Sequence, residues 1–335
     1  MSRFARNKGY LGVAIQATKG TALAPSKFIK YNGGTTMTPE ITFEQYNEGG
    51  DSQYPGVTLK ERHNPNGDFE LLARPAITGL LFAGLLGKDT TTGEAAPYTH
   101  TIIPEDPADM PWLTIERSIA GKIIERVKDA RITEMQISGE AGKPITISAT
   151  YQGLTSGLEA AEQETITYES NMPFIFWQGT YTADSVNVSS DITEFEITIT
   201  NVFDEDEQHS EIVRGDMTLI RREISASFSY KANDTNPADY EDVYYGEDAL
   251  ENSIPLQSMY AGSIDIDLEY GATTGVKGLK ITVPKIIHTQ KSIELDAGSD
   301  ESNAFECEGH AEKGGEEFVT VVVKNEDSTS YIPVE

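Results

Sequence analysis

The sequence is poor in several features that would each point to a class of protein. It has one cysteine, Cys307, which excludes an internal disulfide and fits synthesis in a reducing cytoplasm. The longest apolar run, Ile77 to Leu86, is too short to span a bilayer and contains two glycines. Residues 1–6 lack the apolar stretch of a secretory signal. We therefore expect a protein without a membrane partner that is made and assembled in a cytoplasm.

Basic residues are also scarce. The chain has 26 Lys and Arg against 54 Asp and Glu, for a net charge of −28. Residues 1–160 hold 16 against 18, whereas residues 161–335 hold 10 against 36. Stable binding to DNA needs a basic surface that neutralises phosphates, so the acidic second half argues against it. The charge is compatible with transient passage of double-stranded DNA, and equally with simple solubility.

Motifs for catalysis are missing as well. Neither His-Glu-x-x-His nor Gly-x-Ser-x-Gly occurs, and the Gly142-Lys143 pair is followed by proline instead of the Ser or Thr of a phosphate-binding loop. The five histidines are scattered singly. We therefore predict no enzyme, no catalytic residue, no cofactor and no metal. Acidic clusters at 204–207, at 296–301 and at 265–269 offer oxygens for calcium, but solvated acidic faces explain them too.

The pattern that dominates the chain is the alternation of a β-strand. In Ile264–Tyr270, for example, apolar residues alternate with Asp265, Asp267 and Glu269. One convincing helix, Pro75–Gly87, begins with proline, ends with glycine and is apolar almost all round, so it should be buried against a sheet. These features predict a mainly β protein.

The two halves of the chain repeat the same landmarks in the same order, at an offset that drifts between 146 and 162 residues. The predicted helix at Pro75 returns at Pro237–Gly246. This pattern predicts two tandem duplicated β-sandwich domains, each with one packed helix. The other matching segments are Phe28–Tyr31 with Phe174–Trp177, Ile41–Glu44 with Asp191–Phe195, Thr58–Arg62 with Thr218–Arg222, Phe69 with Phe228, and Tyr151–Gly153 with Cys307–Gly309.

Composition sets the expected boundaries. Long segments at Tyr46–Gly56 and Asn201–Gly215 lie at corresponding places in the two copies, which favours a shared contact role over plain flexibility. The expected parts are an N-terminal arm (1–25), a first domain (26–155), a polar linker (156–170), a second domain (171–325) and a C-terminal tail (326–335).

Several stretches resemble the major tail tube proteins of long-tailed, siphovirus-like bacteriophages, in the form that carries two tube domains per chain. Together they touch most of the first half, whereas the second half resembles the family mainly through the repeat. None of them is a catalytic signature. The stretches are Gly9–Gln16 with Lys19-Gly20-Thr21, Leu80–Lys88, Pro111–Arg117 and Tyr151–Gly153.

The resemblance implies a structural virion protein. In such proteins each domain contributes strands to an inter-subunit barrel, and rings stack into the hollow conduit through which the genome is ejected. With two domains per chain, a homotrimer would give a pseudo-hexameric ring. The implied partners are further copies of the chain and other tail proteins (tape measure, terminator and distal tail proteins). The implied location is the virion tail, assembled in the host cytoplasm.

A conduit must not hold its cargo, so we expect an acidic or neutral lumen. The lumen-facing candidates are Glu194, Glu196, Asp265, Asp267 and Glu269, and their competing placement is the outer surface. Lateral contacts in a ring would join a near-neutral half to an acidic half. The inter-subunit candidates are Arg117, Arg126, Lys128 and Arg131, whose contacts with acidic groups would weaken in high salt.

Two alternatives remain open. The same module also builds tail parts that form one ring, such as a distal adaptor or a terminator. From another class, the chain would be a pair of calcium-stabilised adhesin or carbohydrate-binding β-sandwiches.

Overall fold

The computed structural model describes residues 9–46, 56–163, 165–206, 212–231, 244–245, 261–271, 275–293, 304–313 and 317–333. Its strands form one large antiparallel sheet, which confirms the predicted mainly β class. The strands are β1 (Gly9–Ile15), β2 (Lys27–Ile29), β3 (Thr38–Tyr46), β4 (Val57–Leu72), β5 (Gly87–Thr92), β6 (Tyr98–Pro104), β7 (Leu113–Ile119), β8 (Ile123–Glu140), β9 (Thr146–Leu158), β10 (Gly179–Ala183), β11 (Val186–Asn187), β12 (Ile192–Asp206), β13 (Asp216–Lys231), β14 (Ala261–Tyr270), β15 (Lys277–Ile293), β16 (Ala304–Ala311) and β17 (Thr320–Asn325). The helical elements are α1 (Pro75–Leu86) and two 3₁₀ turns, η1 (Pro107–Asp109) and η2 (Phe176–Gln178).

The two halves share one strand topology. In the first half the pairing order is β1-β7-β8-β9-β4-β3. In the second half it is β10-β14-β15-β16-β13-β12, with every pair antiparallel. The halves therefore repeat one six-stranded unit, as a duplicated sequence requires.

Three β-bulges recur at corresponding places and fix how the copies align. The extra residue in β4 is Glu61 and in β13 it is Ile220. The β7–β8 pair and the β14–β15 pair each carry a bulge, and so do β8–β9 and β15–β16. These bulges align Phe43 with Phe203, whereas sequence comparison alone aligns Ile41–Glu44 with Asp191–Phe195. An alternating pattern matches itself at many offsets, but a bulge does not.

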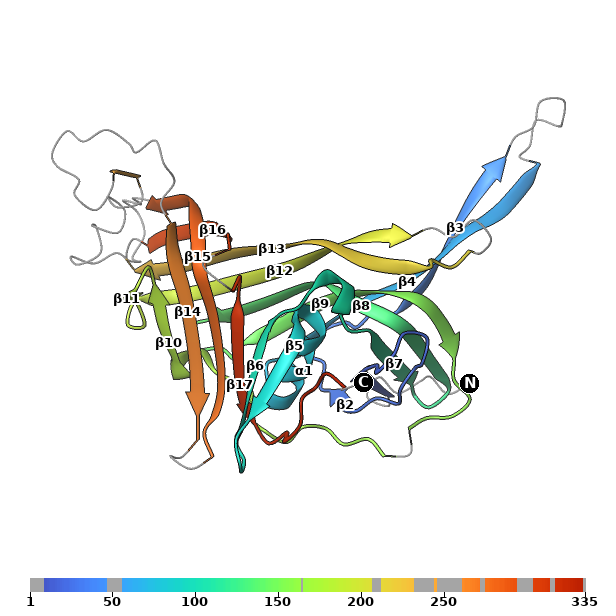
Figure 1. Cartoon of the computed structure of the whole chain (residues 1–335), viewed down its shortest axis with the longest axis horizontal. Coiled ribbons are helices and arrows are strands. Elements are labelled where there is room, and N and C mark those ends of the chain that lie inside the picture. Colours follow the sequence, from blue (N-terminus) through green and yellow to red (C-terminus); the bar gives the residue numbers. More distant parts are fainter. Residues whose placement is uncertain are drawn as a thin grey trace.

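Helix α1 is the buried centre of the first half. All twelve of its residues are buried, and it packs against β6, β8 and β17, as Figure 1 shows. Pro75 opens the helix, and Gly87 ends it in a left-handed conformation with φ of 108°. The predicted helix is thus confirmed. Its expected counterpart at Pro237–Gly246 lies outside the described residues apart from 244 and 245. Among the described residues, no helix is both long and apolar enough to span a membrane.

The first and the last strand of the chain, β1 and β17, both pair within the sheet. Gly9–Ile15, expected within an extended arm, is instead the buried strand β1 between β2 and β7, because its apolar side chains find partners in the same chain. At the other end, β17 pairs with β15 on one side and with β6 on the other, so it joins the two halves. The domain boundaries stay predictions.

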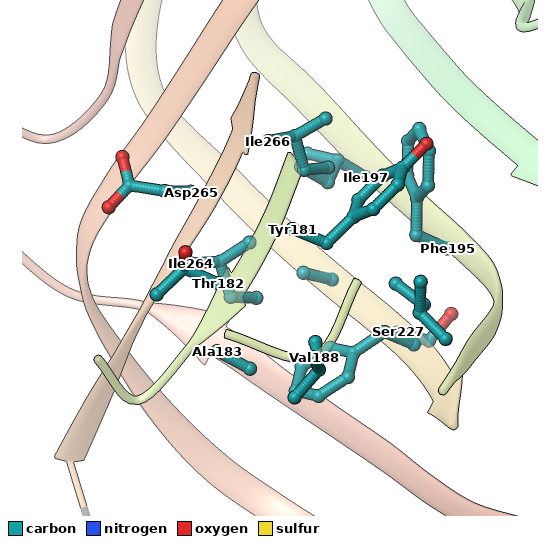
Figure 2. A pocket seen from close by; sticks show the side chains of 13 residues that line it. Tyr181, Thr182, Ala183, Val188, Phe195, Ile197, Ser227, Ile264, Asp265 and Ile266 are labelled. Atoms are coloured by element: carbon teal, nitrogen blue, oxygen red, sulfur yellow. The ribbon is translucent and has the colours of Figure 1, made fainter. Parts of the chain in front are cut away.

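The two copies are filled differently inside. In the second half a small apolar cavity lies between β10–β14 and β12–β13, and Figure 2 shows Tyr181, Ile197 and Ile266 around it. In the first half the corresponding region is crowded. There a side chain at Gly67 would clash with the ring of Tyr151. The two halves share one continuous hydrophobic core, but it is filled differently around the second-half cavity than at the corresponding place in the first half.

A buried histidine fixes the segment after β17. The His100 ring is fully buried, its Nδ1 lies 3.1 Å from Asp89 Oδ2, and its Nε2 lies 2.9 Å from the Asp327 carbonyl oxygen. The ring stacks on Tyr331, whose hydroxyl donates to Asp327. Burial lowers the pKa of His100, but the hydrogen bond and charge of Asp89, together with Asp327, outweigh burial and leave the pKa raised.

This ion pair should make stability depend on pH. A histidine whose pKa is raised by folding stabilises the native state fully below its unfolded pKa of about 6.5, and this contribution is lost as pH rises through the folded pKa. His100→Gln should therefore cost more unfolding free energy at pH 6 than at pH 9, measured by urea denaturation. The control is His310→Gln, at an exposed position on β16. An equal cost of His100→Gln at both pH values would contradict the prediction.

Candidate assembly interface

One face of the sheet is polar over eight consecutive strands. Pairing runs β3-β4-β9-β8-β12-β13-β16-β15, so four strands of each half join at the β8–β12 contact. In antiparallel pairs, residues that lie directly opposite share a face. The side chains in the middle of this face include Asn66, Asp68 and Glu70 of β4, Thr146, Ser148 and Thr150 of β9, Glu134, Gln136, Ser138 and Glu140 of β8, Glu194, Glu196, Thr198 and Thr200 of β12, Glu223, Ser225, Ser227 and Ser229 of β13, and Glu306 and Glu308 of β16.

The composition of this polar face is selective. Its middle consists of hydroxyls, amides and carboxylates, and by register Arg62 of β4 and Arg221 and Lys231 of β13 lie on the same face towards its ends. The opposite face of the same strands is the hydrophobic core, including Phe195, Ile197 and Ile199 of β12. The sheet therefore presents a broad, negatively charged surface on which a polyanion finds few cations to bind.

The structure separates the five predicted lumen candidates into two groups. Glu194 and Glu196 are exposed in the middle of the polar face, and Ser229 donates a hydrogen bond to Glu194. The three carboxylates of β14 lie elsewhere, on strands that run at a steep angle to β12 and β13 in Figure 1. There Asp265 lies 3.7 Å from the amine of Lys280, and Lys324 contacts Glu269 at 2.5 Å. Asp267 lies between them on β14, with its pKa raised by burial and then by Glu269.

The two halves meet where β12 pairs with β8. The register runs from Glu194 opposite Glu140 to Thr200 opposite Glu134, without interruption. Backbone pairing of this kind makes the sheet continuous across the boundary between the copies. The chain thus contains a complete junction between two repeat units.

Polar side chains of the second half cap the end of α1 at this junction. Asn201 Nδ2 donates to the Leu85 carbonyl oxygen at 3.0 Å, and Arg222 Nη2 donates to the same oxygen at 3.1 Å. Arg222 Nε also donates to Asn201 Oδ1 at 2.8 Å. Burial lowers the pKa of Arg222 to about 10, so it stays charged at neutral pH. A cation here satisfies carbonyls at the negative end of the helix dipole.

An aromatic cluster closes the far end of the same junction. Phe203 of β12 packs against Trp112, Leu154 and Met217, three buried residues. The guanidinium of Arg131 lies 3.9 Å from the centre of the Trp112 ring, and its pKa is lowered to about 10 by burial. The hairpin β12–β13 is thereby anchored to the first half by its aromatic side chain.

Three of the four predicted inter-subunit cations have partners inside this chain. Arg117 donates to Glu125 and to the Met37 carbonyl oxygen. Arg126 pairs with the fully buried Glu116 and, at 3.0 Å, with Glu159.

Arg131 bridges the halves by donating to the Met217 and Met110 carbonyl oxygens. Lys128 is half-buried at the bulge of β8. Sequence reasoning missed Asn201 and Arg222, because only the fold brings them to α1.

The polar face ends in two unpaired strand edges. β3 pairs with β4 alone, and residues 290–293 of β15 pair with β16 alone, as judged over the described residues. All nine residues of β3 are exposed, and in Figure 1 β3 and the start of β4 project from the body. Unpaired edges of this length invite pairing with another chain. In the same described part of the chain, no group of three possible metal ligands occurs.

The junction makes a testable prediction about Arg222. Arg222→Met would leave helix carbonyls without their charged donor, so we expect the free energy of unfolding to fall by about 2–4 kcal/mol. The matched control is Arg221→Met, because Arg221 is the exposed neighbour of Arg222 and its guanidinium pairs with Glu223 at the surface. We expect that control to stay within about 0.5 kcal/mol of the wild type. Urea denaturation measures both, and equal losses would refute the capping role.

Comparison with known families agrees with this architecture. The model of a family described as phage tail tube protein matches residues 6–309. No curated protein matches the sequence. Because the match covers nearly the whole chain, the chain belongs to the phage tail tube protein family and is a structural component of the virion tail.

Proposed function

From this membership we propose that the chain assembles as a homotrimer into pseudo-hexameric rings, which stack into the hollow conduit for genome ejection. The observation that carries the proposal is the eight-stranded polar face with an open edge at each end. If β3 of one copy pairs with β15 of the next, the sheet closes and both open edges disappear.

The strand count supports a barrel with a wide bore. Eight strands from each of three chains give a barrel of 24 strands, beyond the 16 to 18 at which barrels leave a water-filled channel. With strands about 4.8 Å apart and tilted by about 40°, such a barrel is roughly 48 Å across at the backbone. Side chains narrow the bore, but it remains an open channel.

The polar face supplies the inner wall in this proposal. Carboxylates such as Glu194 and Glu196 repel phosphates, and short hydroxyl side chains leave the wall smooth. Double-stranded DNA then passes transiently and without sequence preference, because the wall offers few cations for counterion release and its middle carries carboxylates. The carboxylates of β14 are placed outside the bore. No catalytic step, cofactor or metal is required.

Other tail components complete the assembly. The ends of a tube expose the same axial surfaces that stacked rings cover, so we propose tape measure, terminator and distal tail proteins as partners, with assembly in the host cytoplasm.

A single-ring adaptor or terminator is the second candidate, since ring closure alone satisfies the strand edges. Negative-stain microscopy of the concentrated protein distinguishes them: tubes support the conduit, isolated rings support the adaptor, and monomers contradict both.

The assignment of the inner wall can be tested with a bulky label. Glu196→Cys and, as control, Asp267→Cys are biotinylated before assembly; the native Cys307 is buried and should not react. Streptavidin is too bulky to diffuse along the bore. We therefore expect it to decorate only the ends of Glu196→Cys tubes and the whole length of Asp267→Cys tubes. Decoration along the length of Glu196→Cys tubes would place the polar face outside.

A further inference from the structure

We infer that the contact between chains copies the junction already present inside the chain, with hairpin β3–β4 of one copy docked on β15 of a second copy. This inference rests on the proposed function and specifies its partner surfaces. The aligned bulges make β3–β4 the counterpart of β12–β13, and β15 the counterpart of β8. Since β12 pairs with β8 inside the chain, the open β3 edge and the open β15 edge are the corresponding pair.

The exposed apolar side chains of hairpin β3–β4 fit this role. Phe43 is 60% exposed, and its hairpin also exposes Leu59 by 51% and Val57 by 47%. A projecting hairpin with apolar side chains at this density is a binding surface rather than a solvated loop. The corresponding hairpin β12–β13 shows how such an aromatic side chain is covered, because Phe203, the counterpart of Phe43, packs into the Trp112 cluster.

Two apolar side chains lie on the surface of β14 and β15 that would receive Phe43. The bulges align Trp112 with Ala261 and Arg131 with Ile287. Ala261 is exposed and Ile287 half-buried, at the place where the neighbour's Phe43 would arrive. The second half thus offers two smaller apolar side chains where the first half has Trp112 and Arg131, while Glu312 stands at the position of Leu154.

The internal junction also fixes the register. Thr198 lies opposite Gln136 and Thr200 opposite Glu134. Their counterparts place Thr38 of one copy opposite Ser292 of the next, and Glu40 opposite Gln290. Pro39 stands where the first junction has Ile199, so this edge offers one backbone donor fewer. Proline is tolerated on edge strands and limits unwanted pairing there.

The contact between chains lacks the polar caps of the internal junction. Ile41 and His63 stand at the positions of Asn201 and Arg222, so the carbonyl-capping pair is not repeated. The β6–β17–β15 connection, which also ties the halves together, is internal to one chain. We therefore expect assembled tubes to come apart between chains before the two halves of a chain separate.

Engineered disulfides test the register directly. Thr38→Cys with Ser292→Cys should cross-link neighbouring chains in oxidised assemblies, because cross-strand pairs bring Cβ atoms to about 5 Å. On a denaturing gel the ladder should end at three chains, the size of a closed ring. The matched control is Thr198→Cys with Gln136→Cys, which should cross-link within one chain and leave its mass unchanged. Tubes that form without inter-chain cross-links, or ladders beyond three chains, would overturn the inference and leave the tube function standing.

A second pair of variants separates docking from folding. Phe43→Ser should abolish assembly while leaving the melting temperature of the free chain unchanged, since Phe43 is exposed. Phe203→Ser should lower the melting temperature, since its counterpart contact is already made within the chain. Unimpaired assembly of Phe43→Ser would contradict the docking site. Failure of the unmodified protein to form tubes or rings would instead contradict the proposed function.

Discussion

The architecture depends on satisfying both ends of a helix that is buried on every side. The carboxylate of Glu169 accepts from the amides of Ala76 and Ile77 at the beginning of α1, and Arg222 and Asn201 donate to the carbonyl oxygen of Leu85 at its end. Charges of the correct sign therefore meet both ends of the helix dipole. All three capping residues follow the first repeat in sequence, so the first repeat becomes complete only when the second is folded against it.

The two copies have kept the same backbone arrangement, whereas their side chains have diverged. Strand order and bulges recur in both halves, whereas the residues at equivalent positions have diverged. Arg117 corresponds to Ile266: the first contacts Glu125 inside a polar network, and the second lines an apolar cavity. Such divergence would distinguish the two kinds of junction in the proposed ring, one within a chain and one between chains. In that proposed ring, the junction within the chain is made on folding and the junction between chains forms only on assembly.

Alternation and end signals were enough to predict the β class, the repeat and α1. The residue-by-residue alignment of the two copies could not be predicted from the sequence. Segments with period-two alternation match one another at several offsets, and a bulge is visible only once the strands are paired. The alternation of side chains is also insufficient to place the candidate site residues. Glu194 and Glu196 could be predicted because outward carboxylates alternate with core residues. The carboxylates of β14 show the same alternation, but they lie on differently oriented strands beside Lys280 and Lys324. The arginines Arg117, Arg126 and Arg131 looked like surface cations, and only the fold reveals the carboxylates and carbonyls they contact.

The strand β17, held between β6 and β15, has a consequence for how quickly a ring can close. Separate single-repeat subunits would each surrender translational and rotational freedom on joining a six-part ring. In the proposed trimeric ring, half of the contacts are made when the polypeptide folds, so only three bodies must find one another. Because one repeat is covalently tethered to the next, half of the contacts in the proposed ring form by folding within a chain and not by association of separate chains. Nucleation of the ring would therefore depend less steeply on protein concentration.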